Sequence, residues 1–207
     1  MAQIILDSQT GIISNTRRKL NSMYTELYAG ISLAGIIERL TGSYIRVGAE
    51  NDIWLNVTGF KAPGVKPATL VDYGIGDAWE FTDGTDDTVV ARVKFPDNMD
   101  RNQLIKFFVG WNTTTASAGN CIWDIEYLFR SLDDVMDAAA DGTLTATIPA
   151  SAVAKGLSLS LIGEAIPSPT DFCVTIRVKR RADLIGDTLG EDNHLFGVCL
   201  IYTANTL

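Results

Sequence analysis

The strongest constraint on the fold of this chain is an alternation, in three runs between Thr88 and Arg130, that gives each run one apolar and one mostly polar face. Successive side chains of a β-strand point to opposite faces of its sheet, so this alternation places the apolar side chains on one face. Three runs follow the pattern, over residues 88–96, 103–111 and 121–130. We expect these three strands to form half of a two-layer β structure. Their predicted inward side chains are Val89, Ala91, Val93, Phe95, Ile105, Phe107, Val109, Trp111, Cys121, Trp123, Ile125, Tyr127 and Phe129.

Five further strands are predicted on either side of these runs. They cover residues 78–82, 144–148, 156–162, 172–179 and 194–202. The last of them is apolar on both faces, which predicts a central strand or one that another subunit covers. About eight strands with short connections over residues 77–207 predict a mainly β domain, an antiparallel jelly-roll β-sandwich. An immunoglobulin-like sandwich is the alternative, although the Cys…Trp…Cys spacing typical of that fold is absent.

The first 40 residues have a different pattern, which predicts an N-terminal arm followed by a short helix. The helix begins at Asn15 or Thr16, and its apolar side chains recur at spacings of three and four, as in a coiled coil. We expect residues 1–40 to anchor and oligomerise the protein; an amphipathic helix packed on its own domain is the alternative. The predicted oligomer interface consists of Ile4, Ile5, Leu6, Leu20, Tyr24, Leu27 and Ile31.

Residues 41–76 are rich in glycine and proline and predict a connector with short strands, one of them over 53–57. A second short helix is expected over 132–140, with Ser131 as its N-cap and Asp133 and Asp134 in its first turn.

Composition narrows the classes of function. A net charge of −8 argues against binding nucleic acid through its phosphates. The N-terminus lacks the features of a signal peptide, and no apolar run is long enough to span a bilayer, so we expect synthesis in a cytoplasm and no membrane partner. Cys121, Cys173 and Cys199 lack metal-ligand spacing and are expected to be buried free thiols, with one disulfide pair as the alternative.

The residues that could carry chemistry do not form a convincing catalytic site. His194 is the single histidine, and Glu191 and Asp192 precede it as conceivable orienting carboxylates for a serine hydrolase. No nucleophile elbow accompanies it, so we interpret it as a structural histidine at the start of the last strand. The acidic turn with Asp83, Asp86 and Asp87 offers oxygen ligands but does not match a calcium-binding template, so we expect no metal ion.

Two further groups have both a functional and a structural interpretation. The aromatic residues Trp79, Trp111, Trp123 and Tyr127 could form a sugar-stacking shelf, but the last three share the inward parity, which favours core packing. Asp124 and Glu126 could mimic a glycosidase pair, although Lys106 or Arg92 on a partner strand is the simpler counter-charge.

Two basic clusters, Arg17–Lys19 and Lys179–Arg181, stand out in this acidic chain. The first lies in the opening turns of the predicted helix, where the helix dipole disfavours cations. That arrangement favours an acidic protein surface as partner, with a solvated face as the alternative.

Two stretches resemble proteins of bacteriophage particles. The N-terminal sequence resembles the start of tailed-phage virion appendages such as fibres and head-decoration proteins. The resemblance lies in Asp7-Ser-Gln-Thr-Gly-Ile-Ile-Ser-Asn-Thr-Arg-Arg-Lys-Leu-Asn21, followed by Tyr24-Thr-Glu-Leu-Tyr28. The segment from Val93 to Arg130 is similar to phage structural proteins with a C-terminal β-sandwich. The resemblance implies a virion protein, commonly a homotrimer, that is fixed by its N-terminal part and displays its β domain. It implies no active-site residue.

The residues and the resemblance together predict a non-enzymatic structural protein without cofactors. We expect a homotrimeric capsid-decoration or short fibre protein, located in the virion, whose partners are its own copies and other virion proteins. The alternative is a tail-fibre module that binds a host-surface glycan. A third hypothesis, a depolymerase, requires that changing His194 or Asp124 abolishes activity on a polymer.

Overall fold

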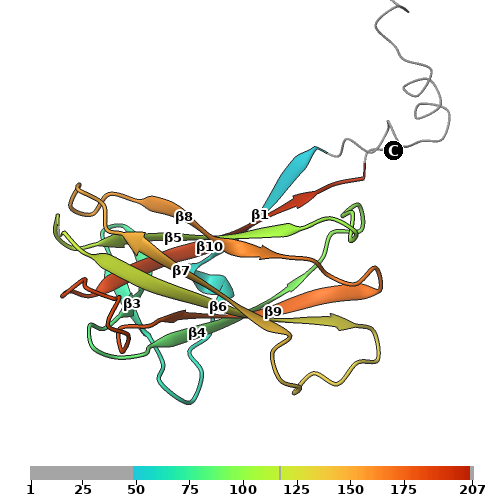
Figure 1. Ribbon diagram of the computed structural model, residues 1–207, viewed down its shortest axis with the longest axis horizontal. Helices are drawn as coiled ribbons and strands as arrows, with labels where there is room; N and C mark the ends of the chain where they lie inside the picture. The colour runs from blue at the N-terminus through green and yellow to red at the C-terminus, as the bar shows by residue number, and fades with distance from the viewer. Residues whose placement is uncertain (1–48, 117, 206–207) are drawn as a thin grey trace, which may run out of the picture. The chain divides into compact units, whose positions relative to one another are not determined.

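Two antiparallel β-sheets pack face to face in the computed structural model, as Figure 1 shows with the layers nearly edge on. The structure describes residues 49–116 and 118–205. The predicted arm, helix and oligomer-interface residues, Ile4 to Ile31, lie outside the described residues, as does the basic cluster at Arg17–Lys19.

Each sheet has a defined strand order. The four-stranded sheet has the order β4 (Thr88–Lys94), β9 (Asp171–Arg180), β6 (Asn120–Ser131) and β7 (Gly142–Pro149). The six-stranded sheet has the order β2 (Thr69–Tyr73), β3 (Gly76–Phe81), β10 (Asn193–Thr203), β5 (Ile105–Thr113) and β8 (Ser158–Ala165), with β1 (Glu50–Asn56) also paired to β10. A short 3-10 helix, η2 (Val57–Gly59), follows β1.

The path of the chain is that of a jelly roll. The strands β3-β10-β5-β8 of one sheet face β4-β9-β6-β7 of the other. From β3 to β10 the chain changes sheet at every connection except the β6–β7 hairpin. Eight strands in two interleaved sheets define this fold. The jelly-roll prediction and all eight predicted strands of residues 77–207 are therefore confirmed.

The core lies between the two sheets and is formed by the predicted inward side chains. All of the predicted set are buried, apart from Tyr127, which is half-buried and packs against the core. Trp123 of β6 meets Phe81 of β3 edge-to-face, with 5.0 Å between ring centroids, and lies 5.9 Å from Trp111 of β5. These three rings join the two sheets at the centre of the sandwich.

The predicted grouping of the three central runs is wrong. β5 lies in the six-stranded sheet, whereas β4 and β6 lie in the four-stranded sheet with β9 between them. Alternation defines which face of a strand is apolar, but both sheets of a sandwich turn an apolar face inward. The same pattern therefore fits either sheet.

The helix expected over residues 132–140 is also absent, and that segment is made of turns. Asp133 has a backbone φ of 72°, in the left-handed region that a helical first turn excludes. The Ser131 backbone N–H donates to Asp134 Oδ2 at 2.7 Å. The local hydrogen bond that resembles a helix cap thus closes a turn instead.

Three other sequence predictions are confirmed, for β10, for the cysteines and for the strand at residues 53–57. β10 is central, because β5 pairs along one edge and β3 and β1 share the other. Cys121, Cys173 and Cys199 are buried and free. The strand expected at residues 53–57 corresponds to β1. Across the described ranges, no helix has the length and apolar character needed to cross a membrane.

Candidate functional site

A groove runs along the outer face of the four-stranded sheet. The loop over residues 60–68 forms one wall, because Lys61 and Val90 exchange backbone hydrogen bonds and the Thr88 N–H donates to the Lys66 carbonyl. Three hollows of about 320, 400 and 410 Å³ lie along this face. The first shares Glu126 and Arg177 with the second, and Val90 and Thr175 with the third, so the hollows adjoin. We call this feature the outer groove.

Charged side chains from β4, β6, β9 and the 60–68 loop line the outer groove. Arg177 and Glu126 form an ion pair at 2.7 Å across the β9–β6 pairing. Lys66 and Lys179 both contact Asp86 Oδ2, at 3.0 and 3.1 Å. The Asp86 side chain is buried, and its Oδ1 has no hydrogen-bond partner among the described residues.

Arg92 supplies a further positive charge to the outer groove. Its Nε donates to Thr175 Oγ1 at 3.0 Å, and within the described ranges it has no ion pair. The side chain is exposed and extends from β4 over β9. Among the arginines of this face, it is therefore the one that no carboxylate neutralises, and the exposed Lys61 of the third hollow likewise has no ion pair within the described ranges.

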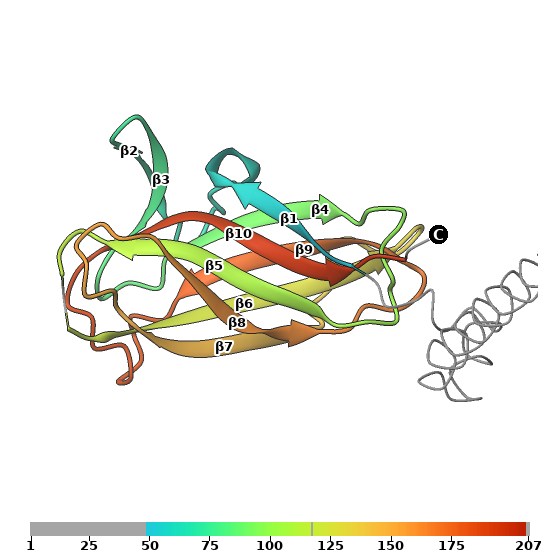
Figure 2. The same cartoon turned by 90° about the horizontal axis from the view of Figure 1, so that it is seen from above.

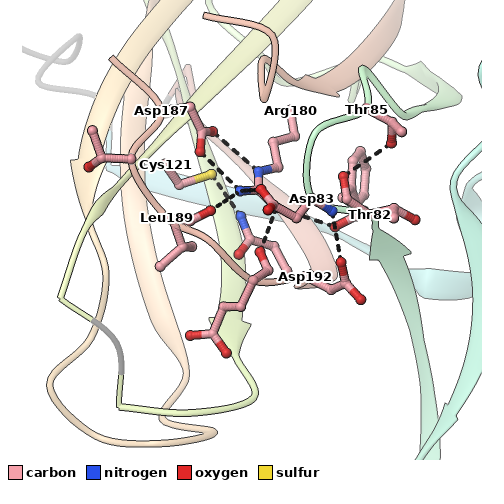
Figure 3. Close-up of polar contacts among 12 residues, drawn as sticks. Thr82, Asp83, Thr85, Cys121, Arg180, Asp187, Leu189 and Asp192 are labelled. Atoms are coloured by element: carbon pink, nitrogen blue, oxygen red, sulfur yellow. Dashed lines mark hydrogen bonds and ion pairs between the residues drawn. The ribbon is translucent and has the colours of Figure 1, made fainter. Parts of the chain in front are cut away.

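A buried arginine at the end of β9 holds two loops together (Figure 3). The Arg180 side chain is 0% exposed and binds Asp187 through Nε and Nη2, at 3.2 and 2.9 Å. It also donates to Asp83 Oδ1 and to the carbonyls of Leu189 and Glu191. Burial would lower the pKa of Arg180, but the hydrogen bonds to Asp187 and the negative charges around the guanidinium, including Asp187 and Asp83, together raise it. The cluster ties the 82–87 turn, which carries Asp86, to the 181–192 loop.

The acidic turn is ordered by separate contacts and does not gather its carboxylates. Asp83 binds Arg180, Asp86 binds the two lysines, and Asp87 accepts the Thr82 backbone N–H at 2.8 Å. The described residues contain no group of carboxylate, histidine and cysteine side chains arranged for a metal ion. Asp86 and Asp87 are buried rather than solvated, because each carboxylate has a local partner.

Two other groups near this end have shifted pKa values. Burial raises the pKa of the Cys121 thiol well above its ordinary value, so the thiol stays protonated at neutral pH. Hydrogen bonds from Arg181 hold the pKa of the exposed Asp183 carboxyl well below its usual range. Arg181 also pairs with Asp124 at 3.0 Å.

The outer face of the six-stranded sheet is apolar over four neighbouring strands, which lie side by side in Figure 2. The strand register places Trp54 of β1 beside Cys199 of β10, then Phe108 of β5, then Leu161 of β8. In the next row Leu159 lies beside Gly110. We call Trp54, Cys199, Phe108, Leu159 and Leu161 the apolar band.

Trp54 lies flat on the sheet because two glycines leave room for its ring. A Cβ at Gly110 or at Gly197 would come within 2.6 or 2.7 Å of the indole. The ring still exposes 44% of its surface, as does Leu161, and Leu159 exposes 53%. A charged row borders the band, with Lys106 bound to Glu50 at 2.7 Å. The band is therefore an exposed apolar surface with a polar edge.

The other predicted site residues have structural roles. His194 is buried at the start of β10, with Nε2 3.4 Å from Glu80 Oε2, whereas Asp192 binds the Asp83 N–H and Glu191 binds Thr115. Trp111 and Trp123 are core residues, as predicted. Trp79 is also buried, and its Nε1 donates to the Val57 carbonyl, so these aromatic side chains form no exposed shelf.

The predicted counter-charges of Asp124 and Glu126 are wrong. Their partners are Arg181 and Arg177 rather than Lys106 or Arg92. β6 pairs with β9, which brings Arg177 opposite Glu126, whereas Lys106 belongs to the other sheet. The outer groove itself was not predicted, because its lining depends on the pairing of β4, β9 and β6.

Comparisons with known proteins give structural likenesses only. No family model and no curated protein sequence matches this chain. The xylan-binding CBM22-1 domain of Paenibacillus barcinonensis Xyn10C is 10% identical, with a TM-score of 0.46, over 76% of this chain and 98% of that one. The CBM35 domain of Cellvibrio japonicus Abf62 is also 10% identical, with a TM-score of 0.42, over 76% of this chain and 100% of that domain.

A δ-endotoxin, Cry8Ea1 from Bacillus thuringiensis, is 10% identical with a TM-score of 0.40. This likeness covers 62% of the present chain and 20% of the toxin. At such similarity none of these proteins indicates what the present chain binds.

Proposed function

We propose that this protein is a structural protein that assembles with its own copies through the apolar band and displays the outer groove. It works by association and binding, without catalysis. Its N-terminal sequence resembles that of phage virion appendages, which supports the proposal that it is a head-decoration or short fibre protein of a bacteriophage particle. The expected assembly is a trimer.

The apolar band is the observation that carries this proposal. An antiparallel sheet with one solvated face ordinarily turns polar side chains outward, as β7 does with Thr143, Thr145 and Thr147. The six-stranded sheet instead exposes Trp54, Leu159 and Leu161 in adjacent strands. Covering such a patch stabilises a complex by about 25 cal/mol per Å² of apolar surface.

A second copy of this chain is the occupant that the chain order favours. β1 carries Trp54 and begins at Glu50, shortly after the 1–40 segment that contains the predicted interface residues Ile4 to Ile31 in the sequence. Association through that segment would raise the effective concentration of the β domains that follow it in the chain. Contacts at the apolar band would then follow with little further loss of entropy.

Replacing Leu161 by Glu tests this assignment in the intact chain. The glutamate would place a charge in the proposed contact, and burying a leucine contributes about 1.5–3 kcal/mol. We expect the association Kd to rise at least about 10-fold, since 1.4 kcal/mol corresponds to a factor of ten. Size-exclusion chromatography with light scattering over a concentration series measures the change.

Thr147→Glu is the matched control, because Thr147 is an exposed strand residue on the other sheet. It should associate as the wild type does. Equal association of all three proteins would reject the apolar band as the contact between copies.

The second candidate function is carbohydrate binding at the outer groove, as in a receptor-binding module of a tail fibre. The specific observation in its favour is a row of adjoining hollows lined by paired and unpaired charged side chains. The two functions are compatible, because the band and the groove lie on different sheets.

A further inference from the structure

We infer that the outer groove binds an acidic polysaccharide, a chain of hydroxylated sugars that carry carboxylates. This inference rests on the display of the groove in the proposed function and adds the chemical class of its ligand. Its first basis is shape. The three hollows adjoin along the sheet and are open at the surface, which suits an extended chain better than a compact molecule.

The charge of the groove is the second basis. Its lining includes the cations Lys61, Lys66, Arg92, Arg177 and Lys179, against the carboxylates Asp86, Glu126 and Asp137. Cations thus outnumber carboxylates here, in a chain whose net charge is −8. A local excess of positive charge in an acidic protein attracts an anionic ligand.

The third basis is the presence of acceptors that a purely anionic ligand would not satisfy. The partly exposed Glu126 carboxylate lines the first and second hollows beside Arg177. An ionised carboxylate only accepts hydrogen bonds, so a ligand group that lies against it must donate one. A sugar hydroxyl can donate, whereas the carboxylates of the ligand cannot.

Arg92 is the residue that we expect to recognise a ligand carboxylate. Its guanidinium makes one hydrogen bond, to Thr175, and its remaining N–H groups can form a bidentate pair with a carboxylate. Arg177 and Lys179 are already paired with Glu126 and Asp86, so they contribute mainly to the potential of the groove.

The test measures binding of the full chain by isothermal titration calorimetry. The probes are polygalacturonate, alginate and hyaluronate, with fully methyl-esterified polygalacturonate as the form whose carboxylates are masked. We expect binding to at least one acidic polymer, weakening as salt is added, and no binding to the esterified form. Arg92→Ala should raise the Kd at least about 10-fold.

Lys94→Ala is the matched control, because Lys94 lies two residues further along the same strand, pairs with Asp97 and does not line the hollows. It should change the Kd less than about 2-fold. Polyglutamate is the acidic-peptide probe, and equal binding of it would replace the sugar by a peptide ligand and overturn the inference.

Binding of the esterified polymer as tightly as polygalacturonate would overturn the acidic class but leave carbohydrate binding in place. No binding to any acidic polymer would also overturn the inference. Association is measured separately with Leu161→Glu, so neither binding result bears on the assembly proposal.

Discussion

Replacing Arg180 by Met should lower the free energy of unfolding by about 3–5 kcal/mol, because it leaves the Asp187 carboxylate buried without its cation. Arg180 is fully buried, and the Asp187 side chain is 1% exposed. The carbonyls of Leu189 and Glu191 would lose their donors as well. Urea unfolding followed by tryptophan fluorescence measures the change.

Two variants make this result specific to the buried pair. Arg177→Met changes the same residue type on the same strand, but its ion pair with Glu126 is half exposed, so it should cost less than about 1 kcal/mol. Adding Asp187→Asn to Arg180→Met removes the uncompensated charge and should recover part of the loss. Equal effects of Arg180→Met and Arg177→Met would contradict the role of the cluster.

Replacing Trp123 by Ala should destabilise the fold by about 3–5 kcal/mol, the cost of a large cavity in a packed core. The indole of β6 contacts Phe81 and Trp111 of the opposite sheet, so its loss opens the contact between the layers. Thermal and urea unfolding both report this change. A loss below 1 kcal/mol would show that these rings do not hold the sheets together.

The phenylalanine variants provide a finer comparison. Trp111 Nε1 donates to Ser160 Oγ at 3.2 Å, whereas the buried Trp123 Nε1 has no partner among the described residues. Trp111→Phe therefore breaks a hydrogen bond and Trp123→Phe does not. We expect Trp111→Phe to cost about 1 kcal/mol more, and the reverse order would contradict this account of the core.

Alternation of side chains predicted the strands and the core of this protein well. It identified Val89, Trp111 and Trp123 as inward residues, because a two-residue period depends on the local chain alone. It misplaced β5 because the choice between two apolar-faced sheets depends on contacts distant in sequence. The missed turn at Asp133 reflects a left-handed backbone conformation that a pattern of polar residues does not specify.

The candidate surfaces were harder to predict for the same reason. Arg92, Thr175 and Glu126 lie on separate strands, and the outer groove exists only when β9 pairs with both β4 and β6. The apolar band was equally hidden in the sequence. Leu157, Leu159 and Leu161 alternate with serines in the predicted strand over residues 156–162, and the alternation alone does not show that these leucines face outward, as they do in the structure.

We propose that copies of this chain meet through the apolar band, and sedimentation equilibrium of the intact wild-type chain at micromolar concentration tests this contact. We expect a trimer whose dissociation becomes measurable on dilution when Leu161 is replaced by Glu. A wild-type chain that stays monomeric over the whole concentration range would contradict it.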